Sequence, residues 1–345
     1  ETGLFIAVAK GYFQTVQDLI ELGADIHVAD NQRETPLIRA AFSGRLRLVQ
    51  ILLDHGAVIE AASCTGYTAL IIAATVGNTK IVELLLNRGA MVNAKCDDGK
   101  TALILATYWG YTKTVQLLLD RGADIHSRTI EGMSSLRYAV MNTDYDLVQL
   151  LMDRGANPND EDAKGKTVLE HALMEQDRRI AKALLLRGAS LQRNNRSGFI
   201  PLLAAAKNWE KDIVLMMLDM GANIYDKDDE QGYSVLHWAA ALGWDDIVEK
   251  LLAMGAQVDE LNLAGETPLL LASCGASAKV VRVLLSRGAD IFVRDRGGNT
   301  VMIYAADHDA PLAVLRALTR HGANIYARNP TSNSNPGRDP NDNQS

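Results

Sequence analysis

Residues 79–90 read Thr-Lys-Ile-Val-Glu-Leu-Leu-Leu-Asn-Arg-Gly-Ala. In this stretch Ile81, Val82 and Leu85 have the spacing that places apolar side chains on one face of a helix. Gly89 follows, and a glycine commonly ends a helix because it tolerates the left-handed backbone conformation best. The stretch therefore predicts a short amphipathic helix that ends at Gly89.

The same Gly-Ala ending recurs along the whole chain at steps of 33 or 34 residues. A period this strict means that one supersecondary unit has been repeated and stacked. The glycines of the ten Gly-Ala pairs are Gly23, Gly56, Gly89, Gly122, Gly155, Gly188, Gly221, Gly255, Gly288 and Gly322.

A hydroxyl residue opens the apolar segment upstream of each Gly-Ala pair, except at Ile200 in the seventh repeat. Its side-chain oxygen can accept a hydrogen bond from an unpaired N–H of the first helical turn, so it predicts a helix N-cap. Each repeat is then two helices, followed by a polar hairpin, and buries its apolar side only by stacking on its neighbours. The predicted caps are Thr2, Thr35, Thr68, Thr101, Ser134, Thr167, Ser234, Thr267 and Thr300.

Two openings carry a family signature, namely residues 265–269, Gly-Glu-Thr-Pro-Leu, and residues 232–240, Gly-Tyr-Ser-Val-Leu-His-Trp-Ala-Ala. With the Val-x-x-Leu-Leu-x-x-Gly-Ala endings, the chain resembles the ankyrin repeat family from residue 1 to about residue 328. The resemblance implies an all-α solenoid of stacked helix-turn-helix units joined by β-hairpin-like loops. It also implies a partner protein bound by the hairpin tips and the exposed side of each first helix, which line a concave groove.

The ends of the chain suggest its domain organisation. We expect one ankyrin repeat domain over residues 1–328, with a truncated first repeat and a last repeat that acts as a C-terminal cap. Because the chain opens inside a repeat, we also expect it to be a fragment of a longer protein. Residues 329–345 contain no aliphatic or aromatic residue, so they predict a disordered tail.

Composition argues against several classes of partner. The net charge is −7, and the 35 Lys and Arg residues are dispersed, whereas a nucleic-acid site needs a concentrated basic stripe. No apolar run approaches the ~20 residues of a membrane helix. Three cysteines without a dense framework indicate a reducing compartment. We therefore expect a monomeric array in the cytoplasm, or alternatively the nucleus, without nucleic-acid binding or membrane insertion.

Catalytic and metal-binding patterns are missing from the sequence. No CxxC, HExxH, GxGxxG or GxxxxGKS/T motif occurs, and the seven histidines lie in different repeats and positions. We expect no catalytic residue, metal or cofactor, and a chain that is not an enzyme. His237 is the strongest isolated histidine, and the favoured interpretation is a hydrogen bond to the Ser234 cap of its own repeat.

Two rows of variable positions predict where a partner protein binds. Apolar residues recur just before the inner turn of each repeat and just before each cap, and exposed aromatic and Met side chains are typical of interface hot spots. We predict a strip centred on Tyr108 and Trp109. Its other members are Tyr67, Val76, Met133, Met141, Phe199 and Tyr233.

Alternatives remain open for this strip and for the function. Tyr108 could instead pack on a neighbouring hairpin, and Met174 could fill a gap between helices. The favoured function is a non-catalytic protein-interaction module. The alternative is a substrate-recruiting array of a multidomain enzyme or nucleotide-switch receptor whose catalytic domain lies upstream.

Repeats five to seven lack the glycine of the inner turn and carry Thr143, Gln176 and Trp209 instead. We expect these helix ends to be closed by other means and to be less stable locally. Sequence drift explains the loss, while a bend or a second contact site is the sharper alternative.

Overall fold

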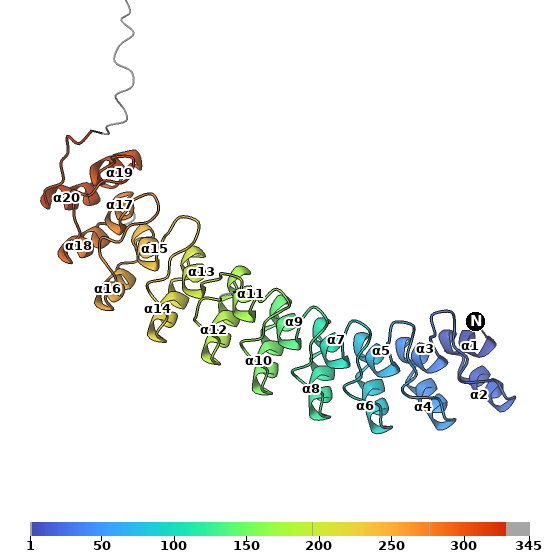
Figure 1. Ribbon diagram of the computed structural model, residues 1–345. Coiled ribbons are helices and arrows are strands. Elements are labelled where there is room, and N and C mark those ends of the chain that lie inside the picture. The colour runs from blue at the N-terminus through green and yellow to red at the C-terminus, as the bar shows by residue number, and fades with distance from the viewer. Residues whose placement is uncertain (1, 195, 276, 329–345) are drawn as a thin grey trace, which may run out of the picture. The chain divides into compact units, whose positions relative to one another are not determined.

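The computed structural model describes residues 2–194, 196–275 and 277–328. The chain divides into two compact units, which we call unit 1, residues Glu1–Ser190, and unit 2, residues Leu191–Ser345. In unit 1 the odd-numbered helices form one row and the even-numbered helices a second row, called inner and outer helices below (Figure 1). The helices of unit 1 are α1 Gly3–Lys10, α2 Phe13–Glu21, α3 Pro36–Phe42, α4 Leu46–Asp54, α5 Ala69–Thr75, α6 Thr79–Asn87, α7 Ala102–Tyr108, α8 Thr112–Asp120, α9 Ser135–Met141, α10 Tyr145–Asp153, α11 Val168–Met174 and α12 Arg178–Leu186.

Unit 2 repeats the same helix-turn-helix pattern. Within the described residues of both units the regular secondary structure is helical, and the hairpins contribute only isolated β-bridges, such as that between Arg128 and Ser134. The predicted all-α fold is therefore confirmed. The helices of unit 2 are α13 Pro201–Lys207, α14 Lys211–Asp219, α15 Val235–Ala241, α16 Asp245–Ala253, α17 Pro268–Ser273, α18 Ala278–Ser286, α19 Val301–Asp307 and α20 Leu312–Arg320.

The inner helices begin where the hydroxyl residues predict. The Oγ1 of Thr68 accepts a hydrogen bond from the N–H of Ile71 at 3.3 Å, and the equivalent bond recurs at most of the other caps. No side-chain bond caps α13, which follows Ile200. At Ser234 the ring of His237 joins the cap, since Nδ1 lies 2.9 Å from the Oγ of Ser234, as predicted. These local bonds fix the start of each repeat.

The inner turns of repeats five to seven close in the same way as the glycine turns. Thr143, Gln176 and Trp209 have φ angles of 52°, 57° and 62°, in the left-handed region that Gly110 occupies at 74°. The expectation of a different closure is therefore wrong. The reason is that the turn N–H must still reach the helix carbonyl three residues back, as the N–H of Thr143 reaches Val140 at 3.0 Å. The turn conformation is therefore kept, at the cost of backbone strain in a residue that has a Cβ atom.

Packing explains why the array needs its repeats. In α7 the residues from Ala102 to Thr107 are buried, because the helix packs between α5 and α9. The outer helix α8 buries Val115 and Leu118 on the face that it turns to α7. The hairpins of consecutive repeats are joined by single backbone bonds, such as that from Ile130 N–H to the carbonyl of Asp98 at 3.0 Å.

The expected tail at residues 329–345 lies outside the described residues. The extent of the domain and the capping role of the last repeat stay predictions.

Candidate partner-binding groove

The end of each inner helix presents its side chains to solvent. In α7 the burial stops at Thr107, and Tyr108 and Trp109 follow with 45% and 54% of their surface exposed. Because the flanks of α7 are covered by α5 and α9, its last turn is the part that remains open. The predicted centre of the strip is therefore exposed.

A pocket with a volume of about 380 Å³ lies beside these two aromatic residues. We call it the aromatic pocket. Its lining comes from α5, α7, α9 and the intervening hairpins. The lining residues are Tyr67, Thr75, Lys100, Ile104, Leu105, Tyr108, Trp109 and Tyr138.

The aromatic rings of the pocket hold one another edge to face. The ring of Tyr108 lies 5.0 Å from that of Trp109 at 85°, and 5.3 Å from that of Tyr138 at 88°. Edge-to-face pairs are favourable because the positive ring edge meets the negative ring face. Tyr108 thus packs on a helix of the neighbouring repeat and not on its hairpin, and it still keeps nearly half of its surface exposed.

Tyr67 forms the other side of the aromatic pocket. It packs on the buried side chains of Ile71, Cys96 and Leu105. Burial raises the pKa of the Tyr67 phenol, and burial likewise raises that of Tyr138. Both hydroxyls therefore keep their protons at neutral pH and can donate hydrogen bonds.

Lys100 brings the charge of the pocket. Its Nζ donates to Oδ2 of Asp98 at 3.0 Å, and this bond raises the pKa of the ammonium. Lys100 lines the pocket together with Tyr67 and Tyr138. The hairpin thus holds a cation beside the aromatic surface.

Only some of the predicted strip residues meet in this pocket. Tyr67, Tyr108 and Trp109 line it, whereas Val76 and the exposed Met141 lie outside the lining. Met133, half-buried in the hairpin before α9, also lies outside it. The last two predicted residues, Phe199 and Tyr233, are half-buried in unit 2.

Five of the eight lining residues were not predicted as binding residues, and the two that shape the chemistry of the pocket are Lys100 and Tyr138. Lys100 was passed over because it is not apolar. Tyr138 was missed because it lies on the inner helix, four residues after the cap, where the preceding repeats carry Ile72 and Leu105. A bulky aromatic residue four positions after a cap is a signal that could have been found by comparing this position between repeats, as was done for the positions before the inner turn and before each cap.

Unit 2 holds a second pocket, of about 340 Å³, at equivalent positions of its own repeats, and we call it the acidic pocket. The carboxylate of Glu266 accepts hydrogen bonds from the hydroxyls of Tyr233 and Tyr304. Burial raises the pKa of the Cys274 thiol to about 11, and the charges of Glu266 and Asp307 contribute to that shift. The acidic pocket is lined by Tyr233, Glu266, Leu271, Cys274, Asn299, Ile303, Tyr304, Asp307 and His308.

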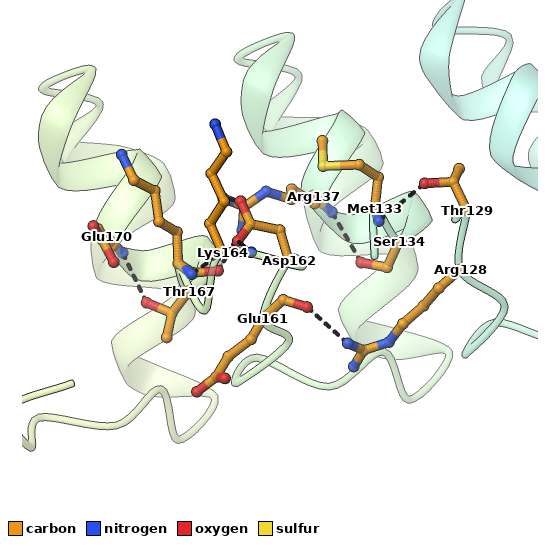
Figure 2. Close-up of polar contacts among 11 residues, drawn as sticks. Arg128, Thr129, Met133, Ser134, Arg137, Glu161, Asp162, Lys164, Thr167 and Glu170 are labelled. Atoms are coloured by element: carbon orange, nitrogen blue, oxygen red, sulfur yellow. Dashed lines mark hydrogen bonds and ion pairs between the residues drawn. The ribbon is translucent and has the colours of Figure 1, made fainter. Parts of the chain in front are cut away.

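A buried arginine fixes the hairpin tip next to the groove. Arg137 of α9 is only 4% exposed and points at Asp162 of the following hairpin, with 2.9 Å between Nη2 and Oδ2 (Figure 2). Its Nη1 donates to the carbonyl of Lys166 at 2.7 Å. The buried Glu170 adds a favourable charge interaction that opposes the lowering of the Arg137 pKa by burial.

Arg137 takes the place that His237 has in unit 2. The Nε2 of His237 lies 3.0 Å from the carbonyl of Glu260 and 3.2 Å from that of Glu266, the residue equivalent to Lys166. In both repeats a buried donor on the inner helix ties down the next hairpin.

The described residues contain neither a metal-binding cluster nor a membrane-spanning helix. No group of three or more His, Cys, Asp or Glu side chains there could hold a metal ion. No helix in the same part of the chain is long and apolar enough to cross a membrane.

Comparison with known proteins agrees with the fold and the repeat length. A family model described as ankyrin repeats in three copies matches residues 4–96, 59–129, 136–228, 176–262 and 236–329. The crystal structure of the ankyrin repeat domain of Bcl-3 is 32% identical and superposes with a TM-score of 0.58, covering 62% of this chain and 98% of that domain.

Curated relatives share shorter stretches. An ankyrin repeat-containing protein of Treponema pallidum (strain Nichols) is 35% identical over 128 residues, 36% of this chain and 41% of that protein. The human BCL-6 corepressor-like protein 1 is 32% identical over 127 residues, 37% of this chain and 7% of that protein. The human 2-5A-dependent ribonuclease is 37% identical over 79 residues, 23% of this chain and 11% of that enzyme. The chain thus spans less than half of the length of each of these relatives.

Proposed function

The chain belongs to the ankyrin repeat family, and on that premise we propose that it is a non-catalytic module that binds a partner protein through the groove and hairpin tips of unit 1. Ankyrin repeats are generally protein-interaction modules. The observation that carries the proposal is the aromatic pocket, in which two large aromatic side chains stay about half exposed beside a cavity of about 380 Å³.

The physics of interfaces supports this position. Trp and Tyr dominate binding hot spots because they offer a large apolar surface and lose little side-chain entropy. The ring contacts of Tyr108 with Trp109 and Tyr138 fix the rings before a partner arrives. A fixed surface binds more tightly, since less freedom is lost on association.

The other predicted strip residues are included in the proposal as contacts outside the aromatic pocket. Val76, Met133 and Met141 extend the surface around the aromatic pocket, and Phe199 and Tyr233 would form a separate contact on unit 2. The proposal further includes a monomeric array over residues 1–328 that acts in the cytoplasm, for which the low cysteine content is the argument.

Affinity capture from native lysate tests the proposal with a matched tryptophan control. The Tyr108→Ala/Trp109→Ala variant should lose the partner that the wild-type chain captures, and Trp109→Ala alone should weaken its binding about thirtyfold, the effect of a hot spot of about 2 kcal/mol. Trp209→Ala removes a tryptophan of unit 2 that is 72% exposed, and should leave capture unchanged. Equal capture by all variants of unchanged melting temperature would refute the site.

A further inference from the structure

Every polar side chain of the aromatic pocket can donate a hydrogen bond. Its lining carries phenol hydroxyls, an indole N–H and the ammonium of Lys100, and none of its eight lining residues has a carboxylate. The raised pKa values of Tyr67 and Tyr138 keep their hydroxyl protons in place. A ligand that supplies acceptors would suit the ammonium and the indole N–H, which can only donate.

Lys100 has capacity left for a ligand. An ammonium has three N–H groups, and among the described residues Asp98 is the one acceptor of a hydrogen bond from Lys100. The side chain of Lys100 is 30% exposed, and Asp98, which is outside the lining, holds it in place at 3.0 Å. Two N–H groups therefore remain for an acceptor that approaches over Tyr67 and Tyr138.

A second cation stands in the same tip row two repeats further on. Lys166 precedes the cap of α11 as Lys100 precedes that of α7. Its backbone is held on both sides, by the guanidinium of Arg137 and by the carboxylate of Asp162 at 2.9 Å. No ion pair is found for its ammonium within the described residues. Its charge also lowers the pKa of the nearby His171, although burial is the larger cause.

The spacing of the two lysines defines a length of partner chain. Stacked helices lie roughly 8–10 Å apart, so two repeats separate the lysines by about 20 Å. An extended chain covers this distance in about six residues, at about 3.3 Å per residue.

We propose that the groove of unit 1 takes an extended segment of a partner protein with an aromatic or branched aliphatic side chain in the aromatic pocket, an acidic side chain beside it at Lys100, and a second acidic side chain about six residues away at Lys166. This inference rests on the proposed function and names the chemistry of the partner. Charge complementarity carries it, since Lys100 lines the apolar surface and Lys166 stands two repeats further along the same row.

The acidic pocket of unit 2 offers an internal comparison. At its equivalent positions, Glu266 and Asn299 replace Tyr67 and Lys100, and Asp307 and His308 replace Tyr108 and Trp109. The pocket of unit 2 thus carries two carboxylates at these positions, whereas the pocket of unit 1 carries the ammonium of Lys100. An acidic segment that recognises the groove of unit 1 should be repelled at that pocket.

Selection from a random peptide display library against the immobilised full chain tests the inference. We expect the enriched peptides to place Asp or Glu beside an aromatic or Leu residue and again about six positions away. Lys100→Met should weaken the selected peptides about fivefold, as for an exposed ion pair. Lys100→Glu should weaken them at least tenfold and should select Lys or Arg at that position.

Lys113→Glu is the matched control, because it makes the same charge change at an exposed residue of α8 on the outer row and should leave binding unchanged. Peptides that depend on Trp109 but show no preference for acidic residues would overturn this inference and leave the proposed function standing. If no enriched peptide loses binding to the Tyr108→Ala/Trp109→Ala variant, the proposed site itself is wrong. The melting temperature of each variant separates loss of contact from loss of fold.

Discussion

Replacing Arg137 by isoleucine should destabilise the middle of unit 1 by about 3–5 kcal/mol. The guanidinium is 4% exposed, and its two bonds reach Asp162 and the carbonyl of Lys166 in the next hairpin. Isoleucine is the test residue because repeat four carries Ile104 in the same column. The substitution therefore suits the shape of the site and removes only the charge and its bonds.

The magnitude follows from three opposing contributions. Two hydrogen bonds from a charged donor are lost, at about 1.5–3 kcal/mol each. The buried isoleucine side chain returns about 2 kcal/mol through its apolar surface. The carboxylate of Glu170, itself 4% exposed, loses a neighbouring positive charge, which adds about 1–3 kcal/mol. The balance centres on the range observed when one partner of a buried ion pair is removed.

A second variant separates charge from packing. Arg137→Ile/Glu170→Leu also removes the buried carboxylate whose charge interacts with Arg137, so Glu170 is no longer left without a neighbouring positive charge. The double variant should therefore recover the Glu170 contribution, about 1–3 kcal/mol of the loss. Arg154→Ile is the surface control, because the pair of Arg154 with Asp120, at 2.8 Å, is exposed and should contribute less than about 1 kcal/mol.

Native-state hydrogen exchange read by mass spectrometry is the assay, since it resolves the local opening free energy of peptides within residues 134–186. Urea unfolding followed by circular dichroism gives the accompanying global change. Two results would refute the reasoning. One is a stability of Arg137→Ile within about 1 kcal/mol of the wild type. The other is a double variant as unstable as the sum of the two single variants, which would mean that the charges do not interact.

Two further predictions concern the histidines and the strained turns. Burial lowers the pKa of His237 below the usual value near 6.5, so the unfolded chain binds a proton that the folded chain does not, and the melting temperature should fall from pH 7 to pH 5.5. This dependence of the melting temperature on pH should be weaker in His237→Gln, although His171, whose pKa burial also lowers, should retain part of it. It should persist in the control His308→Gln, because His308 is exposed. An equal pH dependence in the wild type and in both variants would contradict the assignment. Gln176→Gly should raise the free energy of unfolding by about 1 kcal/mol, because φ at Gln176 is 57°, which glycine adopts without strain. Glu175→Gly should lower it by about 0.5–1 kcal/mol, because φ at Glu175 is −80° and glycine loses more backbone entropy there. Calorimetry that finds both variants destabilised would exclude strain at this turn.

Local signals explain why the fold could be predicted. A cap such as Thr68 bonds to a residue three positions away, and Gly89 ends its helix with its own φ of 87°. Neither effect depends on distant parts of the chain, so the sequence pattern alone reveals them. The closure of the turn at Gln176 was predicted wrongly because the repeat imposes its conformation and the residue itself does not favour it.

The candidate site could be predicted only in part because it crosses repeats. Tyr108 and Trp109 stand at the end of their own helix, where a period of 33 or 34 residues identifies them as variable and open. Tyr138 reads as a core residue in its own repeat, and it reaches the pocket only because α9 lies beside α7. A pocket between repeats depends on which side chains two neighbours offer together, and such pairs are not visible in one repeat.

The column three residues after each cap shows how scaffold and recognition are connected. Repeats two to four fill it with Ile38, Ile71 and Ile104, and the next two repeats fill it with the opposite charges of Arg137 and Glu170. Charges in a helix usually indicate a solvated face, so the sequence alone does not mark these two residues as buried. In the structure Arg137 holds the carbonyl of Lys166, whose side chain is the second cation of the inferred binding groove. The buried arginine thus helps to set the position of a half-buried lysine, because its bond to the Lys166 carbonyl and the bond from the Lys166 N–H to Asp162 together hold the hairpin tip that carries the charge.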